Sequence, residues 1–509
     1  MAAGDQAADD ISAGASAAPE PLEVRSVGCL RLCGEGPLVA WDGPEGTRLF
    51  GGLAPAAAAA LVDQVRGLAS LPLAADPALV SHQLDLEQPF FRLQRPLVLE
   101  GCGIVDPERI EAALAHGSYA QLRRVLHELS PEAVREQVRR SGLRGRGGGG
   151  YPTGLKWDTV ALQPPGRRYV VCNADEGDPG AFMDRSVLEG DPHRLLEGMA
   201  IAAYAVGADH GYLYVRAEYP LAIERLRLAL QQARQQGLLG PSIAGTAFAL
   251  ELEVRVGAGA YVCGEETALL HSIQGQRGIP RTRPPYPAQA GLWGAPTLIN
   301  NVETFAAVPV ILRQGGDWYA AIGSEGSRGT KVFSLSGAIR HTGLVEVPMG
   351  ISLRTVVETM GGGDPDGGAV KAVQTGGPSG GCIPADLLDT PVDFESLLSL
   401  GSMMGSGGMV VIGQGTAMPE VARHFMAFSV NESCGKCVPC RAGTVQLLAL
   451  LDRFVEQRAT AADLEALEAL CAMVKATSLC GLGQAAPNPV LSTLRHFRQE
   501  YTAALGPGS

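Results

Sequence analysis

Four cysteines near the C-terminal end constrain this chain more than any other feature. Cys434, Cys437 and Cys440 have C-x2-C-x2-C spacing, and Cys480 follows further along. Four thiolates are the ligand set of a [4Fe–4S] cube, and they can also hold a structural zinc ion. The two Cys-x2-Cys steps share Cys437, whereas zinc sites typically use two separated pairs, so the spacing favours iron–sulfur. A cluster that moves single electrons needs a donor, so the rest of the chain is expected to supply a two-electron partner.

Size and composition limit the function classes. The 509 residues are 46% hydrophobic, which allows about three or four globular domains. No apolar run approaches the ~20 residues of a membrane-spanning helix, so no direct membrane insertion is expected. The net charge of −12 disfavours a nucleic-acid partner, and the single Arg-Gly stretch at 144–148 is not an RNA-binding tract. The eleven cysteines and the lack of a signal pattern predict a reducing, cytoplasmic location.

Composition and periodicity divide the chain into six segments. Residues 1–22 are rich in Ala, Asp, Ser and Pro and are expected to form a disordered tail. Next come a short strand-and-helix segment (23–72), a linker (73–105) and an α/β domain (106–330). They are followed by a small domain of the β-grasp kind (331–415) and a four-helix bundle (416–509) with the cluster ligands at its turns.

The α/β domain is predicted from strands and helices that alternate after residue 168. The expected strands are 168–172, 211–215 and 248–256. The expected helices, one after each strand, are 193–206, 220–236 and 265–273. This repetition indicates a mostly parallel, Rossmann-like sheet with helices on its faces. Functional loops should then lie at the carboxyl ends of the strands.

Loops of unusual composition fall where such a sheet would bind a ligand. Acidic residues fill the loop 173–180, glycines and two glutamates the loop 257–266, and prolines the stiff loop 280–287. The glycine-rich stretch 142–157 contains one G-x-G-x-x-G pattern. It is not a dinucleotide-binding fingerprint, because a charged helix and not a buried strand precedes it, and it is not a Walker loop, because no Gly-Lys-Ser/Thr occurs. Its backbone amides can still approach a phosphate or a flat ring, with the cation Lys156 close by.

Five long motifs occur in one order and carry a family resemblance. They are the stretches 144–157, 173–180 and 257–267, the pair 288–294 with 300–304, and the cluster motif. On these motifs, over roughly residues 105–505, the chain resembles the FMN- and NADH-binding flavoprotein subunit of respiratory NADH:quinone oxidoreductase. The same module serves NAD-linked hydrogenases and formate dehydrogenases.

The N-terminal segment resembles the second half of a thioredoxin-like [2Fe–2S] domain. Cys29 and Cys33 form its C-x3-C pair, but no cysteine precedes Cys29, so a cluster-free remnant used for docking is expected. Joined to the flavoprotein module, this segment makes the chain resemble most the beta subunit of soluble NAD-dependent formate dehydrogenase. The implied partners are a molybdenum- or tungsten-containing formate dehydrogenase catalytic subunit and a small [2Fe–2S] thioredoxin-like subunit.

The resemblance implies FMN in the glycine-rich cleft and no general acid or nucleophile, because hydride passes directly between nicotinamide and flavin. Lys156 would meet the pyrimidine end of the flavin ring. Asn300, Asn301 and Thr304 would hold the ribityl-phosphate. The residues implied around FMN are Gly145, Gly147, Gly148, Gly150, Lys156, Asn173, Asp175, Glu176, Tyr261, Gly264, Glu265, Asn300, Asn301 and Thr304.

For NAD(H), the resemblance implies five residues. Tyr151 and Tyr286 would stack adenine, Arg283 would help to hold the nucleotide and Glu266 would bind ribose. Asp178 stands where respiratory members commonly have Glu, close to the adenosine ribose. A carboxylate there disfavours a 2′-phosphate, so NAD is expected over NADP.

Each assignment has a simpler alternative. The glycines could serve turns alone, and Lys156 could be a solvated cation. The acids Asp175, Glu176, Glu265 and Glu266 could cap helices or lie in first turns. The cysteines expected to be buried small residues are Cys102, Cys172, Cys263, Cys382 and Cys471.

Together these expectations describe a diaphorase that moves electrons between NAD(H), FMN and a [4Fe–4S] cluster. Its expected setting is a complex that converts formate and NAD⁺ to CO2 and NADH. The alternatives within the enzyme class are the diaphorase of a hydrogenase and a subunit of the respiratory complex. The alternative from another class is a non-catalytic scaffold with a zinc knot.

Overall fold

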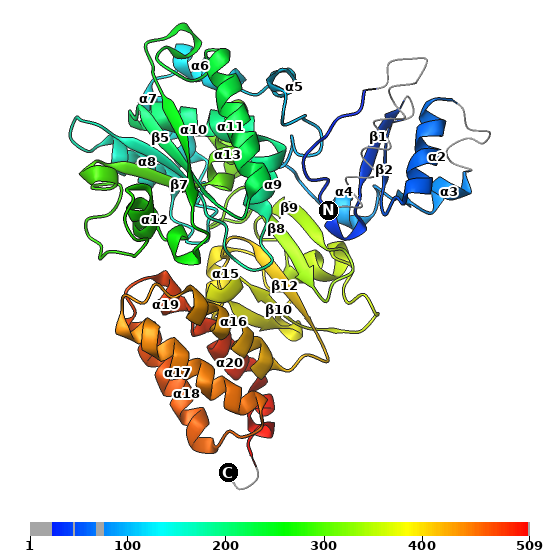
Figure 1. The fold of residues 1–509 in the computed structure, drawn as a ribbon, viewed down its shortest axis with the longest axis vertical. Helices are drawn as coiled ribbons and strands as arrows, with labels where there is room; N and C mark the ends of the chain where they lie inside the picture. Colours follow the sequence, from blue (N-terminus) through cyan, green and yellow to red (C-terminus); the bar gives the residue numbers. More distant parts are fainter. Residues whose placement is uncertain (1–22, 44–45, 68–75, 507–509) are drawn as a thin grey trace.

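The computed structural model describes residues 23–43, 46–67 and 76–506, so the expected tail at 1–22 lies outside the described residues. Figure 1 shows a four-stranded sheet with its helices at one end of the molecule, the C-terminal helices at the other end, and a five-stranded sheet between them. The N-terminal part lies to one side of the five-stranded sheet.

The four-stranded sheet is parallel throughout. Its strands are β4 (Tyr169–Ala174), β5 (His210–Arg216), β6 (Glu251–Gly257) and β7 (Thr297–Asn301), in the order β6-β5-β4-β7. Alternating residues of β4 enter two cores, Val170 and Cys172 on one face and Val171 on the other. The predicted parallel sheet is confirmed. The short strand β7 was not predicted, because its five residues directly follow a loop rich in glycine and proline.

Helices cover both faces of this sheet. Core residues from α10 and α13 pack on one face, and residues of α12 pack on the other. The helices of this part are α5 (Ile110–Ala115), α6 (Ala120–Glu128), α7 (Pro131–Arg140), α8 (Thr153–Ala161), α9 (Met183–Gly190), α10 (Pro192–Val206), α11 (Pro220–Gln235), α12 (Glu266–Ile273), α13 (Val302–Gln314) and α14 (Gly316–Ala320).

The five-stranded sheet has the order β11-β10-β12-β8-β9, and only its β12–β8 pair is parallel. Its strands are β8 (Thr330–Gly337), β9 (Gly343–Pro348), β10 (Val370–Thr375), β11 (Gly381–Pro384) and β12 (Gly408–Gly413). A π-helical segment, η6 (Thr355–Met360), follows β9, and a short α15 (Phe394–Ser399) precedes β12.

Four long helices form the C-terminal part, as predicted, with a short fifth helix between the last two. They are α16 (Met418–Glu432), α17 (Val438–Val455), α18 (Ala461–Thr477), α19 (Gly481–Ala485) and α20 (Asn488–Ala503). Helix α17 begins directly after Cys437, its N-cap residue, and a proline follows in the first turn. Thr460 and Asp463 cap α18 reciprocally, which contributes about 0.5–2 kcal/mol.

The N-terminal part differs from its prediction. It contains β1 (Val39–Gly43), β2 (Gly46–Phe50), α2 (Pro55–Val65), α3 (Pro77–Val80), β3 (Gln83–Leu84) and α4 (Pro89–Arg92), and β3 pairs with β2. The segment 73–105 was expected to be a linker with an extended run, yet the backbone amides of Val98 and Leu99 are buried and donate to the carboxylate of Glu346. Buried amides need such partners, so this segment is packed rather than free.

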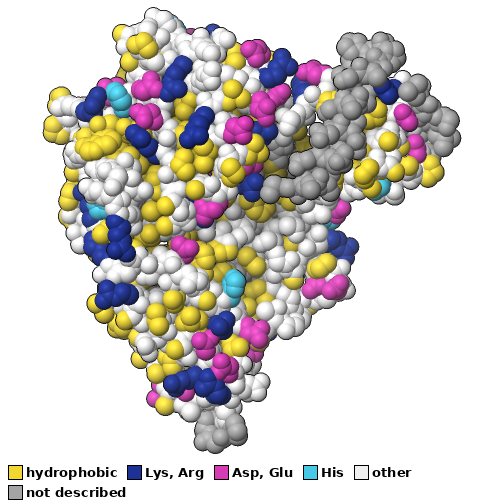
Figure 2. All heavy atoms as spheres, viewed as in Figure 1, with side chains coloured by type: hydrophobic (Ala, Val, Ile, Leu, Met, Phe, Trp, Pro, Cys, Tyr) yellow, Lys and Arg dark blue, Asp and Glu magenta, His cyan; other side chains and the backbone are white. Residues whose placement is uncertain are grey.

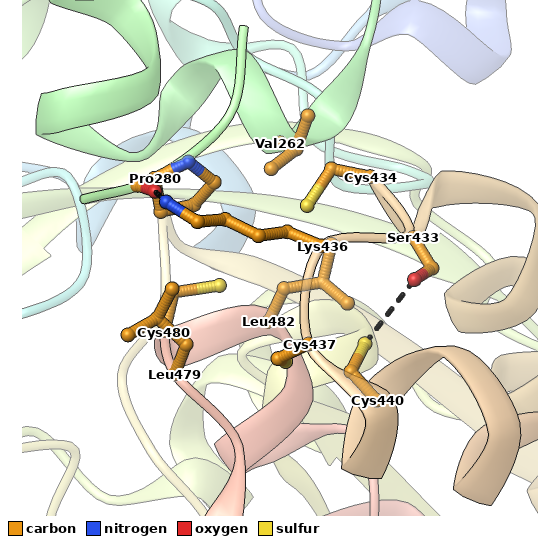
Figure 3. Close-up of a pocket in the computed structure, with 10 residues that line it drawn as sticks. All are labelled: Val262, Pro280, Ser433, Cys434, Lys436, Cys437, Cys440, Leu479, Cys480 and Leu482. Carbon is orange, nitrogen blue, oxygen red and sulfur yellow. Dashed lines mark hydrogen bonds between the residues drawn. The ribbon is translucent and has the colours of Figure 1, made fainter. Parts of the chain in front are cut away.

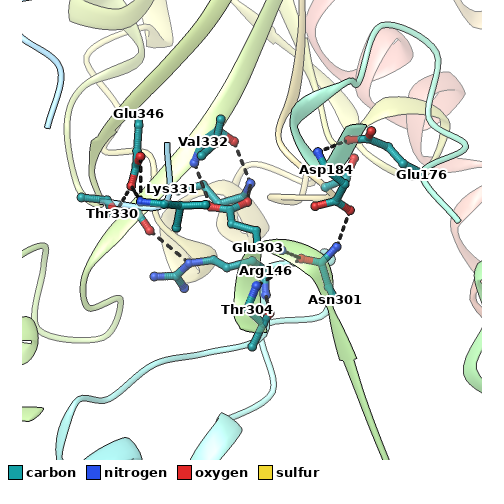
Figure 4. Close-up of polar contacts among 12 residues, drawn as sticks. Arg146, Glu176, Asp184, Asn301, Glu303, Thr304, Thr330, Lys331, Val332 and Glu346 are labelled. Atoms are coloured by element: carbon teal, nitrogen blue, oxygen red, sulfur yellow. Dashed lines mark hydrogen bonds and ion pairs between the residues drawn. The ribbon is translucent and has the colours of Figure 1, made fainter. Parts of the chain in front are cut away.

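A buried polar network joins the four-stranded and five-stranded parts (Figure 4). Lys331 on β8 is fully buried, and its Nζ lies 2.5 Å from Oε2 of Glu303 on α13. The backbone amide of Val332 donates to the same carboxylate at 2.9 Å. Arg146 donates to the carbonyl oxygen of Thr330 at 3.1 Å. The glycine-rich loop that carries Arg146 is therefore held against the five-stranded sheet.

The surface carries both signs of charge. On the face drawn in Figure 2, Lys and Arg side chains are interspersed with Asp and Glu side chains. Within the described part of the chain, none of the helices is both long enough and apolar enough to cross a membrane.

Candidate functional site

A cavity of about 880 Å³ lies where the carboxyl ends of the parallel strands meet the glycine-rich loop. Cavities of this size hold cofactors, and this edge of an α/β sheet is where ligands bind. Most of its wall comes from the α/β part. Ser379 and Ser406 enter from the five-stranded part, and Gly481 and Leu482 from the C-terminal helices. The cavity is therefore completed only when all three parts are docked.

The structure brings nearly all the predicted cofactor residues to this cavity. The exceptions are Gly148 and Thr304, which do not line it. The predicted residues on its wall are Gly145, Gly147, Gly150, Tyr151, Lys156, Asn173, Asp175, Glu176, Asp178, Tyr261, Gly264, Glu265, Glu266, Arg283, Tyr286, Asn300 and Asn301.

The glycine-rich loop forms one side of the cavity. At Gly149, an added Cβ would meet no described atom within 4 Å, so the backbone faces open space there. Gly148 faces away: it has φ +112°, and an added Cβ would lie 3.1 Å from the backbone of Gly405. Gly148 therefore serves close backbone packing against the five-stranded part, and its nearness to a cofactor stays a prediction.

Lys156 is not a free solvated cation. Its Nζ lies 2.5 Å from Oε1 of Glu266 and donates to the carbonyl oxygen of Ile299 at 3.1 Å. Tyr151 and Tyr286 also line the cavity, and their side chains are 54% and 52% exposed. Both rings are therefore available for stacking.

Asp175 is the least satisfied group in the cavity. Both of its carboxylate oxygens are buried and lack a hydrogen-bond partner among the described residues. Burial raises the pKa of Asp175 to about 7, against the opposing effect of Arg216. A buried carboxyl group without a partner is costly, so this side chain fits a ligand that supplies a hydrogen bond.

The other acids of the loop 173–180 already have partners. Glu176 accepts from the backbone amides of Asp184 and Arg185 at 3.0 and 3.1 Å, which confirms that it caps a helix, here α9. Asp178 accepts from Tyr261 at 2.8 Å and from Ser406 at 2.5 Å, and burial raises its pKa. Its carboxylate is thus fixed in the wall of the cavity.

Glu265 is the N-cap of α12, where its side chain accepts from the backbone amides of Thr267 and Ala268. Glu266 lies in the first turn of the same helix. The helix-capping alternative therefore holds for Glu265, while Glu266 turns to Lys156.

The end of β7 is held by internal hydrogen bonds. Asn300 accepts from the indole of Trp157 at 3.0 Å, and Asn301 caps α13. Thr304 lies in the first turn of α13, where its hydroxyl accepts from the backbone amide of Arg146 at 2.9 Å. Thr304 therefore supports the glycine-rich loop and does not line the cavity, and its predicted role in holding the ribityl-phosphate stays a prediction.

Sequence analysis missed the wall residues that come from distant parts. Ser379 lies in the glycine-rich loop 375–381, and its hydroxyl lies 3.2 Å from that of Tyr261. Glycines on both sides of a lone serine are the signal that could have pointed to a close approach here. The missed residues on the wall are Gly149, Thr159, Gly177, Asp184, Val262, Pro287, Ala288, Gln289, Thr297, Ile299, Ser379, Ser406, Gly481 and Leu482.

The four predicted cluster ligands line a second, much smaller space of about 10 Å³ (Figure 3). Cys434 and Cys437 lie in the turn between α16 and α17, Cys440 in the first turn of α17, and Cys480 at the N-cap of α19. Burial raises the pKa of Cys440 to about 11, and a bound metal centre would stabilise its thiolate form.

The four cysteines surround one space. Four thiolates are the ligand set of a [4Fe–4S] cube and also of a structural zinc ion, so the donor set fits either group.

The cluster loop is fastened to the cavity. Lys436 donates to the carbonyl oxygen of Pro280 at 2.5 Å, and Glu432 accepts from the backbone amide of Tyr261 at 2.9 Å. Val262 and Leu482 line both the cavity and the cysteine space. The two spaces are therefore neighbours with part of their walls in common.

The cysteines predicted to be small core residues are buried, as expected. They are Cys102, Cys172, Cys263, Cys382 and Cys471.

Two family models match the chain. The Nuo51 FMN-binding domain matches residues 138–310, which include most of the cavity wall. The iron–sulfur binding region of NADH-ubiquinone oxidoreductase-F matches residues 420–504, which include all four cluster cysteines.

Similar proteins cover most of the chain. The NADP-reducing hydrogenase subunit HndC of Solidesulfovibrio fructosivorans is 53% identical over 81% of this chain and 83% of its own length. The second F-type subunit of the NADH-quinone oxidoreductase of Rhizobium meliloti is 46% identical over 80% of this chain and 97% of its own length.

A solved structure extends the likeness to the fold. A chain of the NAD⁺-reducing [NiFe]-hydrogenase in the H2-reduced state is 34% identical, with a TM-score of 0.73 over 91% of this chain and 74% of that chain. With the two matched regions and the cavity, these likenesses assign FMN and a [4Fe–4S] cluster as cofactors and NAD as substrate. The chain belongs to the family of F-type flavoprotein subunits of NADH:quinone oxidoreductase, and it is a diaphorase module of an NAD-dependent oxidoreductase.

Proposed function

We propose that this subunit exchanges electrons with NAD(H) at the cavity mouth and with partner subunits through its cluster, inside an NAD-dependent formate dehydrogenase. The observation that carries the electron path is the wall common to both spaces, where Val262 and Leu482 lie. Bound FMN supplies the exchange between a two-electron and a one-electron carrier. The chain contributes position: it holds the two groups next to each other.

The residues on the wall divide into two proposed groups. We assign Asp175 and the open backbone at Gly149 to FMN, because an unpartnered carboxyl group and an uncovered backbone suit its polar edges and phosphate. We assign Tyr151, Tyr286 and Arg283 to the nicotinamide nucleotide. Both rings are exposed, and the guanidinium of Arg283 lies 5.9 Å from the ring of Tyr286.

Absorption of the purified, anaerobic chain tests this function. We expect flavin bands together with a broad iron–sulfur shoulder, and reduction of an artificial acceptor by NADH without any oxidation of formate. A folded chain that contains zinc and no flavin would leave the scaffold alternative standing and would refute the electron path.

The formate dehydrogenase setting rests on the N-terminal part. This part carries only the pair Cys29 and Cys33, which cannot complete a four-thiolate cluster in this chain. A hydrogenase is the second candidate, since a chain of the NAD⁺-reducing [NiFe]-hydrogenase in the air-oxidized state matches over 99% of this chain. Metal analysis of the native complex distinguishes them: molybdenum or tungsten supports formate dehydrogenase, and nickel supports a hydrogenase.

NAD is proposed over NADP. The fixed carboxyl group of Asp178 lies in the cavity wall, and a carboxylate near the ribose repels a 2′-phosphate. HndC, however, is named an NADP-reducing subunit. Steady-state comparison of NADH and NADPH with the wild-type subunit decides the matter, and a higher kcat/KM for NADPH would refute the proposal.

The finer fold classes and the domain bounds given above, other than the linker at 73–105, are also proposals. The order β6-β5-β4-β7 with all strands parallel supports a Rossmann-like class, and β11-β10-β12-β8-β9 with a parallel central pair supports the β-grasp class. Figure 1 shows β1 and β2 beside α2, an arrangement consistent with a partial thioredoxin-like segment.

A further inference from the structure

Lys436 brings a positive charge to the space that the four cysteines surround. Of the described residues on the wall of that space, Lys436 alone has an ionisable side chain that is not a thiol. Figure 3 shows this side chain running from the turn between α16 and α17 to Pro280, with cysteine sulfur atoms drawn on both sides of it. Its Nζ donates to the carbonyl oxygen of Pro280 at 2.5 Å. This acceptor is neutral, so it holds the ammonium group in place without cancelling its charge.

Two arginines add positive charge to the same turn. Arg277 donates to the carbonyl oxygen of Cys434 at 3.0 Å, and Arg441 donates to that of Gly435 at 2.8 Å. Among the described residues, the hydrogen-bond acceptors of these two arginines and of Lys436 are all backbone carbonyl oxygens, and none of the three cations forms an ion pair with a carboxylate. Three uncompensated cations therefore gather at the cluster turn.

The acids of the neighbouring elements are bound elsewhere. Glu432 accepts from the backbone amide of Tyr261 at 2.9 Å. Glu265 accepts from backbone amides in the first turn of its own helix, α12. A hydrogen bond to the Pro280 carbonyl oxygen needs only a neutral donor, so fastening the turn does not by itself explain a lysine at position 436.

We propose that Lys436 raises the reduction potential of the bound cluster. A cube held by four thiolates has a net negative charge, and its reduction adds one electron, so the reduced state is more negative by one unit. A nearby positive charge stabilises that state more than the oxidised state. Arg277 acts in the same direction from the α/β part. This role rests on the electron path proposed above, and it adds the group that sets how strongly the cluster holds its electron.

Redox titration of the cluster in the purified, anaerobic chain tests this proposal. The ratio of reduced to oxidised cluster is read from the electron paramagnetic resonance signal at fixed solution potentials. Lys436→Met keeps the length of the side chain and removes its charge. We expect the ratio to fall by about threefold or more, which corresponds to a reduction potential lower by about 30 mV, since tenfold is 59 mV for one electron. Lys436→Arg keeps the charge and should leave the ratio close to that of the wild type.

Two further variants complete the experiment. The control Lys475→Met removes a lysine of the same helical bundle that donates to Asn488 and does not line the cysteine space, so the ratio should not change. Arg277→Gln removes a cation outside the cluster motif and should lower the ratio by a smaller factor than Lys436→Met.

Iron assays of every variant separate the outcomes. The proposal is wrong if Lys436→Met keeps both its iron and the wild-type ratio, or if Lys436→Arg lowers the ratio as much as Lys436→Met does. If Lys436→Met loses its iron, the test passes to Arg277→Gln, and an unchanged ratio there refutes the proposal. A wild-type chain without iron would instead refute the electron path itself.

Discussion

The cluster site and the cofactor cavity are neighbours, but they are assembled in opposite ways. Three of the four cluster ligands come from one turn, and the fourth precedes a short helix of the same bundle. The cavity wall, in contrast, is drawn from three parts of the molecule. The cluster site should therefore depend on local chemistry, and the cavity on the interfaces that hold the parts together.

Removal of one ligand should produce the largest and most local effect. In Cys480→Ser, we expect loss of essentially all cluster iron, because the cube loses its only ligand outside the α16–α17 region. FMN content should be retained, since the cavity wall is intact. Iron and flavin assays measure both. The control Cys471→Ser alters a buried thiol of α18 that does not line the cluster space, and it should keep its iron. Simultaneous loss of flavin in Cys480→Ser would contradict the contrast.

Breaking the buried ion pair should damage the cavity instead. Lys331→Met leaves the buried carboxylate of Glu303 without its cation at the interface between the two sheets. Such a loss costs about 3–5 kcal/mol, so we expect lower stability in urea and weaker FMN retention. The double variant Lys331→Met/Glu303→Leu removes both charges and should recover much of the stability. If the single variant lost iron before flavin, the assignment of this pair to the cavity would be wrong.

The pH dependence of the flavin-free protein should report on Asp175. Its pKa is raised to about 7 in the folded state, so the folded protein holds a proton that the unfolded chain releases near pH 4. Stability from this group is therefore full below about pH 4 and falls as pH rises to about 7, by about 2–4 kcal/mol. Asp175→Asn should remove this slope, as measured by urea denaturation between pH 5 and 8. A wild-type stability that rises over this range would contradict the burial of an unpartnered carboxyl group.

The same contrast explains what sequence could predict. The spacing of Cys434, Cys437 and Cys440 expresses a local geometry, and the structure brings all three to one space with Cys480. The period of the strands predicts the parallel sheet and hence the edge where the loops gather. Ser379 and Ser406 could not be found in this way, because their place on the wall depends on how one part docks on another.

Two of the predicted cofactor residues do not line the cavity. The motifs of Thr304 and Gly148 imply a place beside the cofactor, but the glycine-rich loop also needs support. Thr304 accepts the amide of Arg146, and Gly148 packs on Gly405. A motif records which residues a site requires, and only the structure separates those that touch the ligand from those that hold the loop.

The smallest predicted effect is at the open mouth of the cavity, where contacts are exposed. Tyr286 is 52% exposed, so its ring should contribute one stacking contact of about 0.5–1.5 kcal/mol to nucleotide binding. In Tyr286→Ala, we expect KM for NADH to rise about two- to tenfold with an artificial acceptor, while kcat stays the same, because the contact is equal before and during hydride transfer. The control Trp318→Ala removes a 36% exposed aromatic side chain outside the cavity and should leave KM unchanged. An unchanged KM in Tyr286→Ala would place the nucleotide elsewhere on the wall, whereas a fall in kcat at constant KM would show that Tyr286 positions the reacting groups.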